Sequence, residues 1–375
     1  MISMHHLLWL WRTQSIVRYN LVYRKAAKSA IFEKKVILFS PNFDFMDSSF
    51  DCIYKELLLQ DYDVLIINNH KNNQKNIEYF IKEAATAHFI FSTDNSRIID
   101  CIKFRKETKV ICLWHACGAL KKWGNSKVKY WKQSSFLHRK LFSYQSFNLF
   151  TVSSEKCLSF YSEATGISLK KNVLKATGVS RTDVFFDKSF LAACKNKKNK
   201  LTDKKIILYA PTFRGNNFSE AHSPEFLDFD KLRNEFSNEY IFLIKHHPAA
   251  MSKTYFVPEN CKDFIFDASR EYDISELIVM SDVLIGDYSS LFFEWSLFDK
   301  PILFLTPDLE LYSKGFYIDF ESLIQKNRVN DTNDVIKAIK NLADYDFSFL
   351  KQIRNDFMSA CDGSATKRIL QEMLK

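Results

Sequence analysis

Glycine and proline are scarce in this chain, and several well-known sequence signatures are missing from it. Only 8 of its 375 residues are glycine and 7 are proline, whereas 35 are phenylalanine. Long disordered or glycine-rich stretches are therefore not expected. The sequence contains no Gly-x-Gly-x-x-Gly dinucleotide loop, no Walker loop and no Gly-x-Ser-x-Gly elbow. Their absence argues against the enzyme classes that depend on them.

Metal and disulfide signatures are also lacking. The 8 cysteines include no Cys-x-x-Cys pair and no zinc-type spacing with histidine, a pattern typical of reduced thiols in a cytosolic protein. Asp-x-Asp triplets occur at 61–63, 228–230 and 344–346. The first precedes a predicted strand, the second is expected to cap a helix, and the third to lie in a turn between helices. We therefore expect no metal site and no cofactor.

The positive charge is concentrated in three segments. The net charge of the chain is +9, and residues 1–35, 120–140 and 195–205 carry +6, +7 and +5 respectively. Such local excess indicates anionic partners at particular places. No secretory signal peptide is evident, and no apolar run reaches the roughly 20 residues needed to span a membrane.

The N-terminal segment, residues 1–34, mixes aromatic and basic residues. This composition suits an anionic membrane surface. However, Arg18 and Lys25 fall on the same helical side as Leu7. A helix packed on the body of the protein is therefore the equal alternative.

Short apolar runs alternate with helical patterns, which predicts an α/β protein with parallel sheets covered by helices. Strands are predicted at 35–39, 64–67, 89–91, 110–114, 149–152, 173–176, 206–209, 241–244, 264–266, 283–285 and 302–305, and helical spacing is found at 77–87, 273–281 and 291–297. The polar run 195–200 is predicted to be a linker. It would separate two Rossmann-like domains, 35–194 and 195–346, with a cleft between them. Residues 347–375 are predicted to be helical and to cross back to the first domain.

Histidines follow two of the predicted strands. His115 comes after the strand 110–114 and shortly before Gly118 and two lysines. An imidazole there suits a general base, and the lysines and any helix starting after Gly118 would favour a bound phosphate. The alternative is a histidine that caps a loop. His246 and His247 follow the strand 241–244, and only one of two adjacent side chains in an extended segment can face a given site.

Further polar residues follow other strands. Thr212 and Arg214, after the strand 206–209, could offer a hydroxyl and a guanidinium to a phosphate, although an ordinary turn around Pro211 is the alternative. Arg181, after the strand 173–176, is a second candidate phosphate ligand.

Ser289 and Ser290 precede the predicted helix 291–297, where they could form an anion site or simply cap the helix. Glu294 could reach a sugar or nucleoside hydroxyl, or could be a solvated helix residue.

These segments, taken in order, resemble the CDP-glycerol glycerophosphotransferase family of teichoic acid synthesis. The matching segments are 114–124, 178–183, 209–214, 245–248, 282–290, 300–304, 315–317 and 361–364, within roughly residues 110–370. Each is short, but the ordered set is specific. The resemblance implies a GT-B fold with a deep cleft between the domains.

The resemblance also implies an activity and a set of site residues. The activity would be transfer of glycerol phosphate from CDP-glycerol to a lipid-linked or polymeric glycan acceptor, with release of CMP. For such an acceptor, the basic segments 1–35 and 120–140 would hold the protein peripherally at the cytoplasmic face of the cell membrane. The two important histidines would be His115 and His247. Contacts to the nucleotide and alcohol would fall on Arg181, Pro211, Thr212, Lys245, Ser289, Ser290 and Glu294.

Two departures from the family pattern bear on this assignment. Residues 115–118 read His-Ala-Cys-Gly where many polymerases read His-Gly-Thr-Pro, which is more similar to the primases. Glu294 stands where an aspartate is usual. The alternatives are a phosphotransferase that uses CDP-ribitol or another CDP-alcohol, and a GT-B glycosyltransferase that uses a nucleotide sugar. A nucleic-acid-binding protein would leave the strand-end histidines unexplained, so we expect no nucleic-acid partner.

Overall fold

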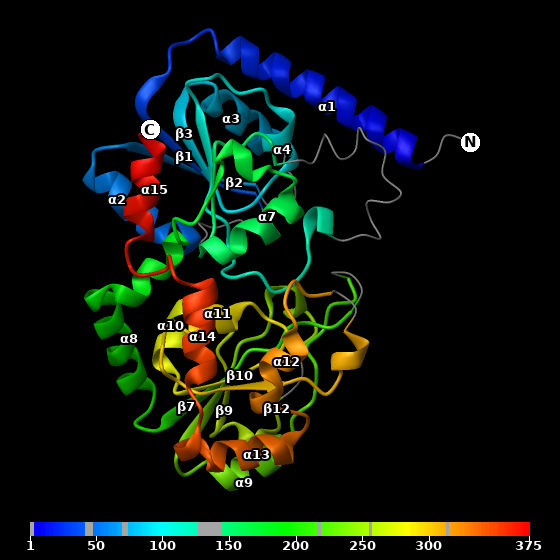
Figure 1. Ribbon diagram of the computed structural model, residues 1–375, viewed down its shortest axis with the longest axis vertical. Coiled ribbons are helices and arrows are strands. Elements are labelled where there is room, and N and C mark those ends of the chain that lie inside the picture. The colour runs from blue at the N-terminus through cyan, green and yellow to red at the C-terminus, as the bar shows by residue number, and fades with distance from the viewer. Residues whose placement is uncertain are drawn as a thin grey trace. The chain divides into compact units, whose positions relative to one another are not determined.

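The chain folds into two compact units that are described separately (Figure 1). The computed structural model describes residues 4–41, 48–69, 74–126, 144–215, 219–254, 257–312 and 315–375, without the side chains of residues 4–13 and 97. Unit 1 comprises Met1–Gly118, Lys122–Asp183 and Ser359–Lys375, and unit 2 comprises Ala119–Lys121 and Val184–Met358. Most of the basic segment 120–140 lies outside the described residues.

Unit 1 contains a parallel sheet of six strands in the order β2-β1-β3-β4-β5-β6. The strands are β1 (Phe32–Ser40), β2 (Asp63–Asn68), β3 (Ala87–Ser92), β4 (Lys109–Cys112), β5 (Leu149–Thr151) and β6 (Leu174–Lys175). Their central residues are mostly buried apolar side chains, as expected of strands covered on both faces. The strand order reverses between β1 and β3, and ligands of open α/β sheets bind beyond the carboxyl ends at such a point.

The helices of unit 1 come from both ends of the chain. They are α1 (Met4–Ala26), α2 (Asp51–Leu59), α3 (Gln74–Ala84), α4 (Arg97–Cys101), α7 (Leu158–Thr165) and α15 (Ala365–Met373), with short 3-10 segments at Ser48–Phe50, Gly124–Ser126, Glu155–Cys157, Leu169–Lys171 and Ser180–Phe186. Ile369, Leu370 and Met373 of α15 pack in the same core cluster as strands β1, β3 and β4. The last residues of the chain therefore complete the core of unit 1.

Helix α1 packs on unit 1 through its C-terminal half. Tyr19 and Tyr23 are buried. The Asn20 amide donates to the carbonyl of Cys101 (2.6 Å) and accepts from the N–H of Lys103 (2.9 Å). The prediction of a packed helix is therefore confirmed for this half of α1. The side chains of residues 4–13 lie outside the described residues, and the membrane interpretation stays a prediction.

Unit 2 contains a second parallel sheet, in the order β12-β11-β10-β7-β8-β9. The strands are β7 (Lys205–Tyr209), β8 (Tyr240–Ile244), β9 (Ile265–Asp267), β10 (Val283–Gly286), β11 (Ile302–Leu305) and β12 (Arg328–Val329). The sequence missed β12, because two residues give no periodicity to detect. In this sheet the strand order reverses between β7 and β10.

Helices also flank the sheet of unit 2. They are α8 (Lys188–Leu201), α9 (Phe229–Phe236), α10 (Ile274–Met280), α11 (Leu291–Trp295), α12 (Phe320–Ile324), α13 (Thr332–Lys340) and α14 (Ser348–Phe357). Short 3-10 segments lie at Pro248–Ala250, Glu259–Cys261, Leu309–Leu311, Gln325–Asn327 and Leu342–Asp344. Side chains from α9, α13 and all six strands of this sheet form one hydrophobic core cluster.

The predicted linker at 195–200 is wrong, because these residues form the second half of α8. The side chain of Asp187 caps this helix by accepting from the N–H groups of Ser189 and Phe190. Lys197 pairs with Glu276, and Lys198 with Asp282 at 2.7 Å. A run of lysines and asparagines without apolar periodicity therefore belongs to a helix that is held by its cap and by ion pairs with neighbouring elements.

Other predicted bounds also differ from the structure. The predicted strand 110–114 ends at Cys112, the helix 77–87 ends at Ala84, and the helix 291–297 ends at Trp295. The predicted helical segment 347–375 forms two helices, α14 in unit 2 and α15 in unit 1. Terminal bounds are the least determined part of a periodic pattern, since caps and turns decide them.

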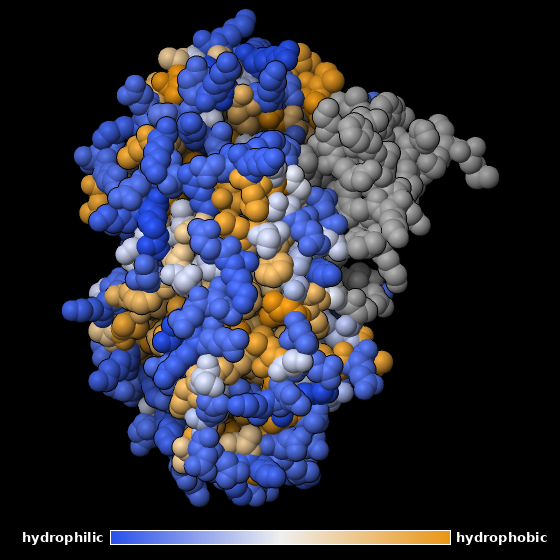
Figure 2. Space-filling view, in the orientation of Figure 1, coloured by the Kyte–Doolittle hydropathy of each residue, from blue (hydrophilic) through white to orange (hydrophobic). Residues whose placement is uncertain are grey.

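The described surface has a mixed character. On the face shown in Figure 2, hydrophobic residues are interspersed with hydrophilic ones. None of the described helices combines the length and the apolar character needed to cross a bilayer. All eight cysteines are free thiols, six of them buried, in line with the expectation from their apolar sequence surroundings.

Gly178 allows a test of how closely the segment before α15 packs against the rest of unit 1. Its φ of 85° is in the left-handed region, and an added Cβ would overlap the carbonyl oxygen of Ala360 in the segment before α15. Gly178→Ala should lower the free energy of unfolding by at least about 1–2 kcal/mol from the backbone alone. At Gly286 an added Cβ would meet no atom closer than 3.9 Å, so Gly286→Ala is the matched control. Equal urea midpoints for the two variants would contradict this account.

Candidate functional site

His115 lies in a loop beyond the carboxyl end of β4, in unit 1. Its side chain is exposed, and its ring centroid lies 4.5 Å from that of Trp114. The Nδ1 atom is 3.2 Å from the carbonyl oxygen of Thr93, which follows β3. Because a carbonyl only accepts, Nδ1 must carry the proton in this contact. The neutral ring therefore presents an unprotonated Nε2, the form that a general base requires.

The backbone of the His115 loop is held on both sides. The hydroxyl of Thr151 donates to the carbonyl of Leu113 (2.7 Å). Gly118 has a φ of 63°; its N–H donates to the Ser153 hydroxyl (2.9 Å) and its carbonyl accepts from Tyr161 (3.0 Å). These contacts engage both backbone groups of Gly118. They give Gly118 a role in shaping the loop, and its predicted contribution to phosphate binding stays a prediction.

Arg181 lies in the 3-10 segment Ser180–Phe186 and is half-buried. The residues beside it are tied to the chain around α15. The hydroxyl of Ser180 lies 2.9 Å from that of Thr366. The carboxylate of Asp183 accepts from the N–H groups of Ala365 (3.1 Å) and Thr366 (2.7 Å), at the start of α15. The backbone that carries Arg181 is thus firmly positioned.

The adjacent histidines beyond β8, in unit 2, have different surroundings. His246 is 2% exposed, and its Nδ1 lies 2.7 Å from the Ser223 hydroxyl. Burial lowers the pKa of His246, and Asp267 opposes that shift. His247 is half-buried and its Nδ1 accepts from the N–H of Ala249 at 3.1 Å. In neutral His247 the proton is therefore on Nε2, so this ring is a hydrogen-bond donor, the opposite of His115.

The side chain of Lys245 is bound to the backbone of a neighbouring segment. Its ammonium donates to the carbonyls of Ser269 (2.9 Å) and Tyr272 (2.6 Å). Burial lowers its pKa, while Asp273, Asp267 and Glu276 act in the other direction. Two of its three donors therefore hold the segment after β9, which leaves at most one for a ligand.

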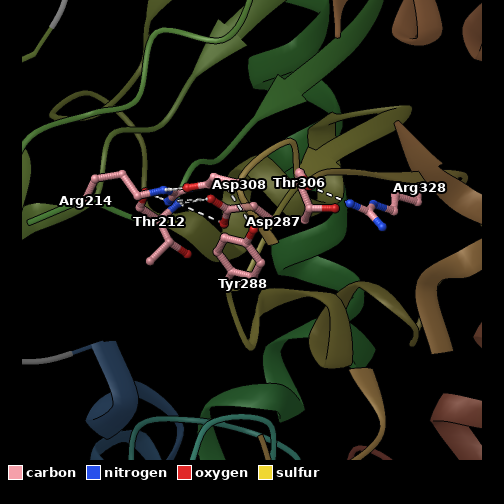
Figure 3. Close-up of polar contacts among 7 residues, drawn as sticks. All are labelled: Thr212, Arg214, Asp287, Tyr288, Thr306, Asp308 and Arg328. Carbon is pink, nitrogen blue, oxygen red and sulfur yellow. Dashed lines mark hydrogen bonds and ion pairs between the residues drawn. The ribbon is translucent and has the colours of Figure 1, made fainter. Parts of the chain in front are cut away.

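A network of buried and half-buried charges lies where the strand order of unit 2 reverses (Figure 3). The Asp287 carboxylate, after β10, accepts from the N–H of Thr212 (2.9 and 3.1 Å) and from Nη1 of Arg214 (2.9 Å). The Asp308 carboxylate, after β11, accepts from Nε of Arg214 (2.6 Å) and from the Tyr288 hydroxyl (2.9 Å). The network thus joins the loops that follow β7, β10 and β11.

Arg214 was predicted to be a phosphate ligand, and its surroundings favour another role. Nη1 also donates to the carbonyl of Thr212 (2.6 Å), and Nη2 donates to Asp308 (3.2 Å). Burial would lower the pKa of Arg214, but the carboxylates of Asp287 and Asp308 overcome this and raise it. Burial likewise would raise the pKa of Asp308, and the hydrogen bond from Arg214 holds it below its usual value. Its charge is balanced by two carboxylates, so Arg214 holds this loop in place, and its predicted contact to a phosphate stays a prediction.

Thr212 and Pro211 are both buried. The hydroxyl oxygen of Thr212 has no hydrogen-bond partner among the described residues, and the same is true of Thr306 after β11. Arg328 donates to the carbonyl of Thr306 at 3.3 Å (Figure 3). Buried hydroxyls normally have partners, and the predicted contact of Thr212 with a ligand stays a prediction.

The helix α11, the two serines before it and Glu294 within it form part of the predicted site. The helix has only five residues, so its dipole contributes less to an anion site than the predicted 291–297 helix would. Ser289 accepts from the N–H of Leu291 (3.2 Å), as a capping residue does, whereas Ser290 makes no side-chain cap hydrogen bond. Glu294 is 2% exposed, which excludes the alternative of a solvated helix residue.

No group of three or more His, Cys, Asp and Glu side chains that could hold a metal ion occurs among the described residues. The three Asp-x-Asp triplets lie in structural positions. The first runs into β2, Asp228 caps α9 by accepting from the N–H of Lys231, and the third spans the end of a 3-10 turn between α13 and α14.

The site residues fall into two groups. His115, Gly118 and Arg181 belong to unit 1, and all the others belong to unit 2. A cleft that joins the two groups stays a prediction. Sequence reasoning did not single out Asp287, Asp308 or the carbonyl of Thr93. Asp287 lies in the matched segment 282–290, whereas a backbone acceptor such as Thr93 leaves no signal in a sequence.

Arg214 should be essential to the stability of unit 2. Arg214→Met would leave two carboxylates without their cation, one of them 3% exposed. Breaking a buried pair in this way typically costs about 3–5 kcal/mol of unfolding free energy. Arg233→Met is the control, because its pair with Asp263 is at the surface, where little effect is expected. Urea unfolding measures both, and an equally small loss for the two would show that the network is dispensable.

Comparisons with known proteins identify relatives over most of the chain. Residues 21–375 match the family model described as CDP-Glycerol:Poly(glycerophosphate) glycerophosphotransferase. The teichoic acid poly(ribitol-phosphate) polymerase of Bacillus spizizenii is 34% identical over 92% of this chain and 56% of its own length. The teichoic acid ribitol-phosphate polymerase TarK of Staphylococcus aureus is 32% identical over 92% of this chain and 69% of its own length. The chain thus spans little more than half of the first relative.

A solved structure has the same fold. The wall teichoic acid polymerase TagF superimposes with a TM-score of 0.79 at 20% identity, over 97% of this chain and 95% of that one. This similarity and the two six-stranded parallel sheets confirm the predicted GT-B-like α/β fold class. The family match covers nearly the whole sequence and agrees with the ordered motifs. The chain therefore belongs to the CDP-glycerol:poly(glycerophosphate) glycerophosphotransferase family.

Proposed function

We propose that this protein transfers an alditol phosphate from a CDP-alditol to a hydroxyl of a lipid-linked or polymeric glycan, with release of CMP. The polymer would be a teichoic acid or a capsule-type polymer. The family match and the names of the relatives support the reaction class. The observation that carries the proposal is the opposite hydrogen bonding of the two histidines, one with an unprotonated Nε2 and one with a protonated Nε2.

In the proposed reaction, the acceptor oxygen attacks the β-phosphorus of the CDP-alditol. A new P–O bond forms, the bond to the bridging oxygen breaks, and CMP leaves with the electron pair. Nε2 of His115 takes the hydroxyl proton, so the attacking oxygen does not have to become an alkoxide in water. In phosphoryl transfer, positioning and charge stabilisation supply most of the remaining catalysis.

His247 would stabilise the donor phosphates by donating from Nε2. Arg181 would add a positive charge, and Ser289 and Ser290 would add hydroxyl donors. Lys245 has one donor left for the same purpose. Pro211, Thr212 and Arg214 would shape the loop over the nucleotide, and Glu294 would contact the alcohol or ribose. The hydrogen bonds that Lys245 and Arg214 already make within unit 2 support the roles given to these two residues.

The proposed donor is a CDP-alditol, and both CDP-glycerol and CDP-ribitol have support. The family description names glycerol phosphate, as the sequence motifs led us to expect. The two relatives compared above are ribitol-phosphate polymerases, and a TagF structure was obtained after a soak with CDPG. CDP-glycerol and CDP-ribitol are therefore both to be assayed, with UDP-sugars as the test of the glycosyltransferase alternative.

His115→Ala should lower turnover by about 10²–10⁴-fold, the usual contribution of a general base, without loss of stability, because the side chain is exposed. CMP release from each CDP-alditol in the presence of a lipid-linked acceptor measures this. His88→Ala is the matched control, because Nδ1 of His88 also contacts a backbone carbonyl, that of Glu33, at 3.0 Å. Near-normal turnover in His115→Ala with both donors would refute the assignment of the base.

We also propose that unit 1 contacts an anionic membrane surface through α1. Val17 and Leu21 are 55% and 62% exposed, and with Arg24 they share one stripe of the helix. This stripe borders a cavity of about 740 Å³ that is also lined by Lys103 and Lys106. Apolar and basic groups side by side are typical of a surface that binds anionic lipid.

Vesicle binding tests the membrane contact. Arg24→Gln should weaken binding to phosphatidylglycerol vesicles about fivefold, since one basic residue contributes about 1 kcal/mol there. Leu21→Asp should weaken it further, and 0.5 M salt should weaken the wild-type protein by screening. Leu59→Asp is the control, because Leu59 is equally apolar and 79% exposed on α2 of the same unit. Equal sedimentation of all the variants with vesicles would exclude this contact.

A further inference from the structure

Trp114 has a backbone conformation that is unusual for its side chain. Its φ is 55°, in the left-handed region. A bulky residue is strained there, and such outliers persist only where the surrounding structure imposes them. They are concentrated at functional sites, and Trp114 directly precedes His115. Trp114 is also the first residue of the matched segment 114–124, although the sequence gives it no role.

The indole of Trp114 is held by an aromatic cluster. The side chain is 6% exposed, and it stacks on Trp123 with a centroid distance of 4.4 Å and an interplanar angle of 25°. Phe150 and Tyr161 lie at 5.3 and 6.1 Å. Aromatic packing of this kind gains free energy beyond simple burial. It can therefore offset the strain in the backbone.

The left-handed residue has a direct consequence for His115. It turns the chain at the end of β4, so that the indole is buried while the next side chain is exposed. The two rings remain in contact at 4.5 Å with an interplanar angle of 35°. On its other side, His115 has the carbonyl of Thr93 at 3.2 Å from Nδ1. The imidazole is thus restrained by one ring contact and one hydrogen bond.

The hydrogen bond alone would not fix the orientation of the ring. An exposed imidazole can turn about its Cβ–Cγ bond, which exchanges Nδ1 with Cδ2 and Nε2 with Cε1. Such a turn would remove Nδ1–H from the Thr93 carbonyl, and the proton could then move between the two nitrogens. The indole lies against the imidazole and limits that rotation. Since Leu113 and Gly118 are fixed by Thr151, Ser153 and Tyr161, the loop itself has little freedom to compensate.

We propose that Trp114 is a positioning residue for His115. Its left-handed backbone and buried indole hold the imidazole with Nδ1–H on the Thr93 carbonyl and Nε2 free. The catalytic consequence rests on the proposed function, whereas the restraint on the ring does not. Trp114 itself touches no substrate in this account.

The first test is made on the wild-type protein. With ¹⁵N-labelled histidine, the resonances of His115 are assigned as those lost in His115→Gln. We expect a single Nδ1–H tautomer and proton–proton Overhauser contacts between this imidazole and the Trp114 indole. An Nε2–H tautomer, or a ring that averages between both, overturns the proposal without any variant of Trp114.

The second test removes the indole while keeping the turn. Trp114→Gly accepts a positive φ without strain, so the backbone can be kept and only the ring is lost. We expect mixed tautomers of His115 and a fall in kcat of about 10²-fold, the effect of misplacing a reacting group by about 1 Å. The KM for the CDP-alditol should stay unchanged, because donor contacts are not altered. Trp114→Phe, which keeps an aromatic ring, should retain most of the restraint.

The control is Trp295→Phe, which alters another buried tryptophan, one whose indole donates to the carbonyl of Lys300 at 2.8 Å. It should lower stability and leave the His115 resonances unchanged. A Trp114→Gly protein with a single Nδ1–H tautomer and normal kcat would overturn the proposal. If the tautomers respond as expected but the wild-type protein uses no CDP-alditol, the proposed function fails and the positioning role stands.

Discussion

The hydrogen bond from Nδ1 of His115 to the carbonyl of Thr93 determines what this site can do. A backbone carbonyl accepts only, so the contact assigns the proton to Nδ1 and leaves Nε2 as a base. Thr93 follows β3 and His115 follows β4, and the two strands are neighbours in the parallel sheet. The chemistry of the imidazole is therefore set by strand order, since the carboxyl ends of adjacent parallel strands lie at one edge.

In unit 2, a network of charged side chains joins the loops that follow β7, β10 and β11. These loops lie at the edge of the sheet where phosphates are expected to bind. Asp287, Arg214 and Asp308 form the centre of this arrangement, and the main chain of Thr212 is attached to it. Buried ions are costly unless each has a partner. Both carboxylates therefore need Arg214, whose hydrogen bonds leave one guanidinium N–H for a further partner.

Most of the strands, and the polar residues that follow them, could be predicted from the sequence. The hydrogen bonds and ion pairs that these residues make could not. Apolar runs such as 283–285 and 241–244 are central strands, because burial on both faces demands them. The lysine-rich α8 escaped detection, because a cap at Asp187 and ion pairs to distant residues replace apolar periodicity. His115 was found from its place after a strand, whereas its tautomer depends on a backbone atom in another loop. The ion pairs of Arg214 likewise depend on residues far along the chain.

Transfer of an alditol phosphate is the central claim about this protein, and analysis of the reaction products tests that claim most directly. The protein would be incubated with CDP-glycerol or CDP-ribitol and a lipid-linked glycan, and the products analysed by mass spectrometry. We expect the acceptor to gain one or more alditol-phosphate units, with one CMP released for each unit. An acceptor that gains a sugar from a UDP-sugar, or that stays unmodified with both CDP-alditols, would contradict it.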